Sequence, residues 1–188
     1  VTAENREEVA RALQEETGYA LIHPFDDPLV IAGQGTAGLE LLAQAGRMGV
    51  FPEAVLAPVG GGGLLAGLAT AVKALSPTTL LLGVEPEVAD DARRSLEAGR
   101  LFRLEAPPRT RADGVRTLSL GEHTFPILKE KADGILVVSE EAILEAERLL
   151  FTRTKRGVEP TGGVEARAER GHRSGARRVL HALTLWCR

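Results

Sequence analysis

The sequence predicts an α/β protein whose core is an open, parallel, twisted sheet with helices on both faces. Short apolar runs of strand length alternate with longer Ala- and Leu-rich runs of helix length, and the connections between them are short. The run at 79–84 is apolar as expected for a parallel strand that is covered on both sides. With 188 residues the chain is about one domain in size.

The first elements are predicted from capping and turn residues. Thr2 can cap a helix over about 3–16, and Gly18 ends it. The apolar residues Tyr19 to Ile22 are expected to form a short buried strand. His23 to Pro28 is expected to be a loop, because each proline disfavours regular structure in the residue before it.

The remaining elements follow from the hydrophobic pattern. Ser139, with Glu140 and Glu141 behind it, is a capping signal for the last long helix. Residues 179–186 can form a further strand. The expected helices are 35–48, 64–75, 90–98, 124–131 and 139–154, and the expected strands are 54–57, 79–84 and 134–138.

Composition excludes several classes of protein. The net charge of −3 gives no reason to expect nucleic acid as a partner, and no apolar run reaches the roughly 18 residues of a membrane-spanning helix. The single cysteine, Cys187, excludes an internal disulfide and fits a reducing compartment, so we expect a cytoplasmic location.

Four consecutive glycines, Gly60 to Gly63, lie between the strand at 54–57 and the helix at 64–75. In this arrangement backbone N–H groups can close around a phosphate at the N-terminus of the helix. Glycines place no Cβ in the way and tolerate positive φ angles. A flexible linker is disfavoured, because a buried strand and an apolar helix frame the run.

Two nucleotide motifs resemble this loop without matching it well. Walker A needs a lysine directly after the loop, whereas the first lysine here is Lys73. Gly61 to Ala66 satisfies the spacing of the dinucleotide fingerprint, and Glu85 ends the next strand. A Rossmann-type NAD-dependent oxidoreductase therefore remains an alternative.

Six short segments, in this order along the chain, carry a family resemblance. Residues 1–163 resemble the fold-type II pyridoxal-phosphate enzymes, in particular the threonine/serine dehydratase and serine racemase group, with a likeness to short bacterial threonine dehydratases. The resemblance implies the large domain of that fold and a pyridoxal 5'-phosphate-dependent ammonia-lyase that converts threonine or serine to a 2-oxo acid and ammonia, or a related serine racemase. The six segments are His23 to Pro28, Ile31 to Thr36, Pro58 to Leu64, Gly83 to Pro86, Ala112 to Val115 and Glu159 to Gly162.

The resemblance also assigns cofactor-binding residues. Five backbone N–H groups would hold the cofactor phosphate, Gly114 would lie at the edge of the cofactor ring, and Glu159 would line the pocket. The five are those of Gly60, Gly61, Gly62, Gly63 and Leu64.

A divalent-cation site is the last assignment that the resemblance implies. Glu85, the carbonyl of Ala89 and Asp91 match it, and such oxygen ligands suit Mg²⁺ or Ca²⁺. Simpler roles are open for the same residues: Asp90 or Asp91 can cap the next helix, and Glu85 can be an acid at the end of a strand. His23 fits a loop hydrogen bond better than catalysis.

The family's Schiff-base lysine and its substrate-carboxylate loop match no segment here. The four lysines, Lys73, Lys129, Lys131 and Lys155, are each expected at the surface. We therefore expect residues 1–162 to be a partial dehydratase-like domain, with no catalytic residue of its own and no turnover alone. The complete enzyme is expected to be a homo-oligomer, as the family tends to be.

Residues 163–188 depart from the family pattern. From Arg153 to Arg188 there are nine Lys and Arg against three Glu. The Arg- and Gly-rich composition from Gly163 onward is typical of a GC-rich gene translated out of frame, and we expect a frameshift near Gly162. Reading the coding DNA in the other frames tests this hypothesis. A basic tail that binds acidic partners is the alternative.

Overall fold

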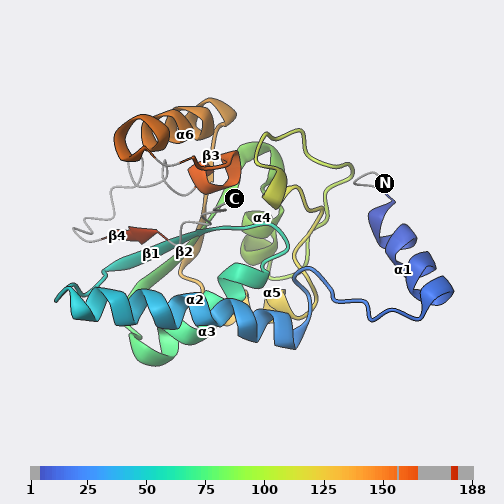
Figure 1. The fold of residues 1–188 in the computed structure, drawn as a ribbon, viewed down its shortest axis with the longest axis horizontal. Coiled ribbons are helices and arrows are strands. Elements are labelled where there is room, and N and C mark those ends of the chain that lie inside the picture. The colour runs from blue at the N-terminus through green and yellow to red at the C-terminus, as the bar shows by residue number, and fades with distance from the viewer. Residues whose placement is uncertain (1–4, 156, 165–178, 182–188) are drawn as a thin grey trace.

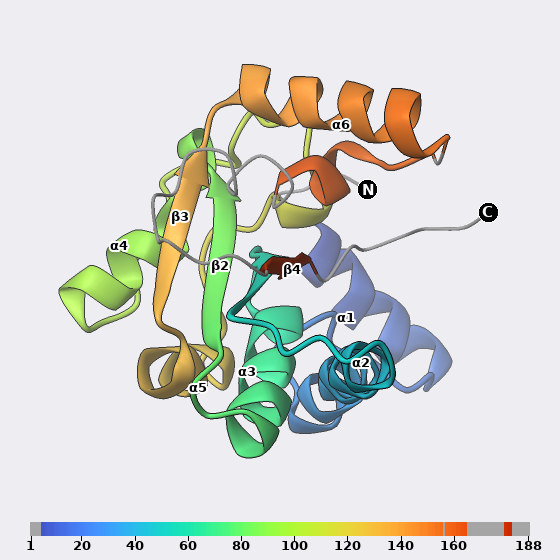
Figure 2. The same cartoon turned by 90° about the vertical axis from the view of Figure 1, so that its left-hand side faces the viewer.

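The computed structural model describes residues 5–155, 157–164 and 179–181. It has a parallel sheet in the order β3-β2-β1-β4 with helices on both faces, which confirms the predicted fold class (Figures 1 and 2). The helices are α1 (Arg6–Thr17), α2 (Pro28–Arg47), α3 (Gly63–Leu75), α4 (Asp91–Ala98), α5 (Thr124–Lys131) and α6 (Glu140–Thr154), and the strands are β1 (Ala54–Pro58), β2 (Leu80–Pro86), β3 (Gly134–Val138) and β4 (Val179–His181). Two short 3₁₀ turns, η1 (Glu87–Ala89) and η2 (Asp113–Val115), precede α4 and α5.

Each face of the sheet has its own apolar core, because successive side chains of a strand point to opposite sides. Val55 and Leu81 pack with residues of α3 and α5 on one face. Leu56 and Val84 pack on the other face with Ile143 of α6. Figure 2 shows α3 and α5 on one side of the strands and α6 on the other.

Helices α2 and α3 approach each other at glycines. A Cβ added to Gly67 would lie 2.5 Å from the amide nitrogen of Gly35 and 2.5 Å from the carbonyl oxygen of Ile31. Gly38 faces the side chains of Leu68 and Val72 in the same contact. Helix packing thus explains Gly35 in the segment Ile31 to Thr36, whereas Gly33 in the same segment has no atom within 4 Å of an added Cβ.

Most of the predicted elements are confirmed within a few residues at each end. Gly18 ends α1 with a left-handed φ of 71°. The hydroxyl of Ser139 accepts from the amide of Ala142 at 3.3 Å and caps α6, as predicted. The predicted Thr2 cap lies outside the described residues, and Asn5 occupies the N-cap position of α1.

Two predictions near the N-terminus are wrong. Tyr19 to Ile22 is not a strand, and Tyr19 and Ile22 are 76% and 77% exposed, because no strand lies beside this segment to pair with it in the described structure. The next helix starts at Pro28 rather than at Gly35. Asp27 caps it by accepting from the amides of Leu29 and Val30 at 2.8 and 3.0 Å, and Pro28 fits the first helical position, where its missing N–H costs nothing.

The C-terminal stretch is described only in part. Val179 to His181 form β4, which agrees with the predicted strand, and the rest of that prediction lies outside the described residues. The frameshift near Gly162 therefore stays a prediction. Among the helices of the described residues, none is both long and apolar enough to cross a bilayer.

Candidate functional site

The glycine loop is a sharp bend between β1 and α3. Val59 still donates to the carbonyl of Val84 at 2.9 Å, in register with the sheet. Gly62, at the N-cap of α3, has a φ of +91°, which L side chains rarely adopt. The predicted strand, bend and helix are therefore present.

Neighbouring atoms leave no space for a Cβ on Gly61, Gly62 or Gly63. A Cβ on Gly61 would overlap the ring of Phe25, and one on Gly63 would lie 2.9 Å from the Cβ of Phe25. On Gly62 a Cβ would lie 2.9 Å from both Leu120 and the hydroxyl oxygen of Thr124. The run of glycines is thus needed for packing as well as for the bend.

The amides of the loop have no hydrogen-bond acceptor among the described residues. Within the described part of the chain, no acceptor is found for the N–H groups of Gly60, Gly61, Gly62, Gly63 and Leu64, and no side chain caps α3. The first turn of a helix leaves N–H groups unpaired and carries partial positive charge. Five such donors in sequence have the chemistry to bind an anion.

A cavity of about 400 Å³ opens at this loop. The seven residues that the sequence predicts as cofactor-binding all line it, although they come from three segments far apart in the chain. They are Gly60, Gly61, Gly62, Gly63, Leu64, Gly114 and Glu159. No lysine or arginine of the described chain lines the cavity, so the positive potential there comes from amides and the helix terminus.

At the far wall of the cavity, η2 contacts the helical residues 160–164. The amide of Gly114 donates to the hydroxyl of Thr161 at 3.1 Å, and a Cβ on Gly114 would lie 3.0 Å from the same oxygen. Glu159 is exposed, two residues before Thr161. The Ala112 to Val115 and Glu159 to Gly162 segments therefore meet at one edge of the cavity.

Seven of the fourteen residues that line the cavity were given no site role by sequence reasoning, and two of them, Thr117 and Phe25, matter most for its shape and chemistry. Thr117 is 8% exposed, and its hydroxyl is buried without a hydrogen-bond partner in the described structure. Phe25 packs its ring on the glycine loop. A single threonine gives no sequence signal for a role in the site. An apolar residue inside a Pro- and Asp-rich loop, such as Phe25, does indicate a packing role.

Other candidate groups lie elsewhere or have structural roles. His23 accepts at Nδ1 from the amides of Asp26 and Phe25 at 2.8 and 3.4 Å, which confirms a loop hydrogen bond. Lys73 donates to Asp133 and to the carbonyl of Thr79 at 2.6 and 2.9 Å. None of the four lysines lines the cavity as the described residues form it.

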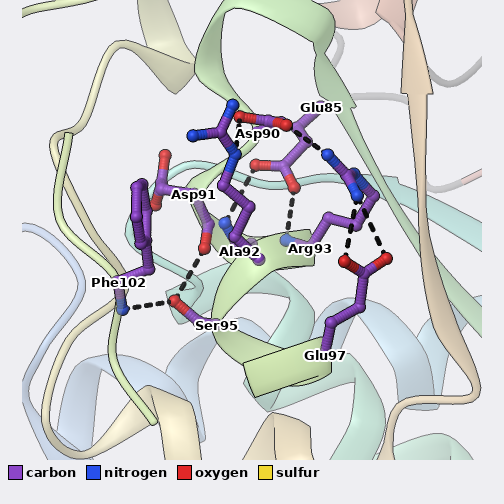
Figure 3. A network of polar contacts seen from close by, with 9 residues as sticks. Glu85, Asp90, Asp91, Ala92, Arg93, Ser95, Glu97 and Phe102 are labelled. Carbon is purple, nitrogen blue, oxygen red and sulfur yellow. Dashed lines mark hydrogen bonds and ion pairs between the residues drawn. The ribbon is translucent and has the colours of Figure 1, made fainter. Parts of the chain in front are cut away.

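Two of the three predicted cation ligands are labelled in Figure 3: Glu85 at the end of β2 and Asp91 at the start of α4. The third, Ala89, ends η1 between them. Glu85 is 1% exposed and accepts from the amides of Ala92 and Arg93 at 3.1 and 2.7 Å. Glu85 therefore caps α4. Asp90 does not cap it, because its carboxylate pairs instead with Arg93 and with Arg94.

Two buried acids in this cluster are hard to ionise. Burial, then the nearby Asp91 charge, raises the pKa of Glu85 to about 9. Burial, then the Asp90 charge, raises the pKa of Asp91 to about 7. One carboxylate oxygen of Asp91 is buried without a partner in the described structure. The described residues hold no group of three or more His, Cys, Asp or Glu placed for a metal ion, so a cation here would need backbone oxygens as well.

The family model described as "Pyridoxal-phosphate dependent enzyme" matches residues 2–184. L-threo-3-hydroxyaspartate ammonia-lyase of Pseudomonas sp is 46% identical over 159 residues, which cover 85% of this chain and 48% of that protein. Serine racemase of Homo sapiens is 45% identical over 161 residues, which cover 86% of this chain and 46% of that protein. The chain spans about half the length of the curated relatives it matches.

Solved structures of the same kind superpose on the chain. A T.th. threonine deaminase is 83% identical with a TM-score of 0.92, covering 96% of this chain and 59% of that one. Maize serine racemase is 34% identical with a TM-score of 0.89, covering 100% of this chain and 58% of that one.

Proposed function

The chain belongs to the family of pyridoxal-phosphate dependent enzymes, and from this membership we propose that it carries the cofactor-phosphate site of an ammonia-lyase of the threonine and serine dehydratase type. The proposed reaction is the elimination of water from a small hydroxy amino acid, after which water hydrolyses the released enamine to a 2-oxo acid and ammonia. The observation that carries the proposal is the row of five unpartnered amides at the start of α3, beside a cavity of about 400 Å³ in the described structure.

The residues present fit the cofactor phosphate. Amides of Gly60 to Leu64 would donate to its oxygens, and the N-terminus of the 13-residue helix α3 would favour its negative charge. The absence of lysine and arginine from the described cavity wall leaves these amides as the main source of attraction. The family membership also favours this cofactor over the nicotinamide alternative.

The remaining lining residues would position the cofactor ring and the substrate. When bound, pyridoxal phosphate supplies an electron sink for the negative charge that develops at Cα. Gly114, held by the hydroxyl of Thr161, would lie against the ring edge, and Glu159 would line the pocket. The buried hydroxyl of Thr117 is without a protein partner in the described structure and is free to bond a ligand.

Threonine or serine is the proposed substrate class. The relatives are named for hydroxyaspartate, serine and threonine, and each of these amino acids carries a hydroxyl on Cβ. A serine racemase is the second candidate, since several relatives bear that name and racemisation shares the loss of the Cα proton.

The chain alone is proposed to bind cofactor without turnover. Lys73 is engaged with Asp133, and no lysine lines the cavity in the described structure. A homo-oligomeric, cytoplasmic enzyme is part of the same proposal. It is supported by the family resemblance and by the single cysteine, and light scattering would test the oligomer.

The cation is proposed to bind at Glu85, the Ala89 carbonyl and Asp91. The unpartnered oxygen of Asp91 in the described structure fits a ligand role, and a divalent ion would offset the repulsion between two buried carboxylates. Glu85 would then have to share its oxygens with the amides that it caps.

Equilibrium dialysis with pyridoxal 5'-phosphate and with pyridoxal, which lacks the phosphate, tests the proposed function. The wild type should bind the phosphorylated form at least about tenfold more tightly, and Gly62→Ala should remove most of that difference. Gly18→Ala is the matched control, because Gly18 also has a positive φ but lies outside the cavity. Equal affinity of the wild type for both compounds would refute the phosphate site, and a borohydride-trapped adduct on a lysine would refute the absence of a nucleophile.

A further inference from the structure

Asp26 binds the start of a helix that begins 98 positions further along the chain. Its Oδ1 accepts from the amides of His123 and Thr124 at 2.8 and 3.2 Å, and its Oδ2 accepts from the amide of Glu122 at 2.9 Å. A Cβ on Gly121 would overlap the same carboxylate. Asp26 therefore fixes the first turn of α5 against the loop at 23–28.

Thr124, the first residue of α5, connects the start of this helix to the glycine loop by a hydrogen bond. Thr124 is fully buried, and its hydroxyl donates to the carbonyl oxygen of Gly61 at 2.7 Å. The amide of Gly121 donates to the Thr124 hydroxyl at 2.9 Å and also lies 3.2 Å from the Gly61 oxygen. The Gly61 carbonyl is thus held from two directions by the α5 start.

Holding one carbonyl orients the next amide. The peptide bond between Gly61 and Gly62 is planar, and cis peptide bonds are absent from the described chain, so the Gly62 N–H points opposite to the Gly61 carbonyl. With the carbonyl turned toward Thr124, the N–H is turned away from α5. That N–H is one of the five without a protein acceptor in the described structure.

The loop at 23–28, which contains Asp26, also covers the other side of the glycine loop. Phe25, adjacent to Asp26, packs on Gly61 and Gly63. His23 holds the amides of both Phe25 and Asp26 and makes an edge contact with the Phe25 ring at 4.8 Å. Both sides of the glycine loop are therefore set by residues 23–26 and the α5 start.

We propose that Asp26 and Thr124 are positioning residues, which act through the Gly61 carbonyl to aim the loop amides at the anion. This inference rests on the proposed function of the loop as a phosphate site. The unpartnered amides would otherwise be free to rotate with the flexible glycine peptides. Neither residue lines the cavity in the described structure. They act by setting the direction in which the loop N–H groups point toward the anion.

Binding of pyridoxal 5'-phosphate to the purified chain gives the first measurement. Thr124→Val, which keeps the shape but loses the hydroxyl, should weaken binding about tenfold, as expected for a lost buried hydrogen bond. Thr124→Ser, which keeps the hydroxyl, should stay within about twofold of wild type. Thr70→Val is the matched control, since its hydroxyl bonds the Ala66 carbonyl inside α3 at 2.9 Å and lies outside the cavity wall.

Asp26 is tested in the same assay against its neighbour. Asp26→Asn should weaken binding, whereas Asp27→Asn removes a comparable helix cap from α2 and should not. Thermal midpoints of the variants show whether stability alone explains any loss. Equal losses in Asp26→Asn and Asp27→Asn at matched midpoints would overturn the inference.

Ligand-free NMR separates this inference from the proposed function. The amide resonances of Gly62 and Gly63 depend on peptide orientation, so Thr124→Val should shift them and Thr124→Ser should not. If the Thr124→Val resonances coincide with wild type, the inference is wrong, whether or not the chain binds the cofactor. If the resonances shift while the wild type binds pyridoxal and pyridoxal 5'-phosphate equally, Thr124 does orient the loop amides. The proposal that these amides bind the cofactor phosphate is then wrong.

Discussion

Gly67 of α3 lies so close to Gly35 of α2 that a Cβ on Gly67 would come within 2.5 Å of the Gly35 amide nitrogen. This contact joins α3, whose first amides are proposed to bind phosphate, to α2, the long helix before the sheet. The two helices cannot separate locally around a new side chain without moving the glycine loop.

Gly67→Ala is therefore expected to destabilise the protein by about 1–3 kcal/mol through overpacking. Thermal or urea unfolding measures the effect. Gly33→Ala is the control in the same helix pair, because Gly33 has no atom within 4 Å of its added Cβ, and the change should stabilise by up to about 1 kcal/mol through helix propensity. An unaltered midpoint for Gly67→Ala would show that the helices adjust without cost.

Divalent cations are expected to raise the thermal midpoint of the wild type. Saturation at about 100 times the dissociation constant would add about 2.7 kcal/mol of stability. Asp91→Asn should lose the effect, because it removes the charge of a buried carboxylate, one oxygen of which has no hydrogen-bond partner in the described structure. Asp133→Asn, which alters the more exposed contacts with Lys73 and the Leu81 amide, should keep it. A cation effect that survives in Asp91→Asn would place the ion elsewhere.

Stability in the presence of a chelator is expected to fall as pH rises. The pKa of Glu85 is about 9 in the folded protein and 4.5 in its ordinary state, so the folded state holds a proton that the unfolded state releases. The favourable contribution of Glu85 to the free energy of unfolding is complete below pH 4.5. It declines as the pH rises toward 9, with a slope of at most about 1.4 kcal/mol per pH unit.

Glu85→Gln tests whether Glu85 causes this pH dependence, because the glutamine side chain does not titrate. The variant should show a flatter dependence of unfolding free energy on pH between 4.5 and 9, although its amide can accept only one of the two cap bonds. Urea unfolding at several pH values gives the comparison. If the unfolding free energies of wild type and variant change with pH in parallel, other titratable groups cause the pH dependence.

The glycine loop between strand and helix could be predicted from the sequence because its signal is local. A strand, four glycines and an apolar helix are adjacent in the chain, and the physical requirement for each lies within about 20 residues. The lining roles of Gly114 and Glu159 were reached through resemblance alone. Nothing local joins them to the loop, and the structure brings them to one cavity through the fold.

The failures concern long-range partners. Tyr19 to Ile22 has the composition of a strand, but a strand needs a neighbour, and none of the described strands lies beside it. The start of α2 was missed because Asp27 and Pro28 are equally typical of a turn and of a helix cap with its first residue. Asp26 and Thr124 could not be paired from sequence, since 98 positions separate them.

The parallel pairing of Ala54 with Val179 has a consequence for synthesis. β2, which pairs with one side of β1, follows soon after it in the chain, whereas Val179 of β4 follows Ala54 by 125 positions before it can pair with the other side. During that interval one row of backbone donors and acceptors on β1 is available to strands of other nascent chains. Slow translation over the intervening codons would prolong this exposure, and chaperones that shield sheet edges would shorten it.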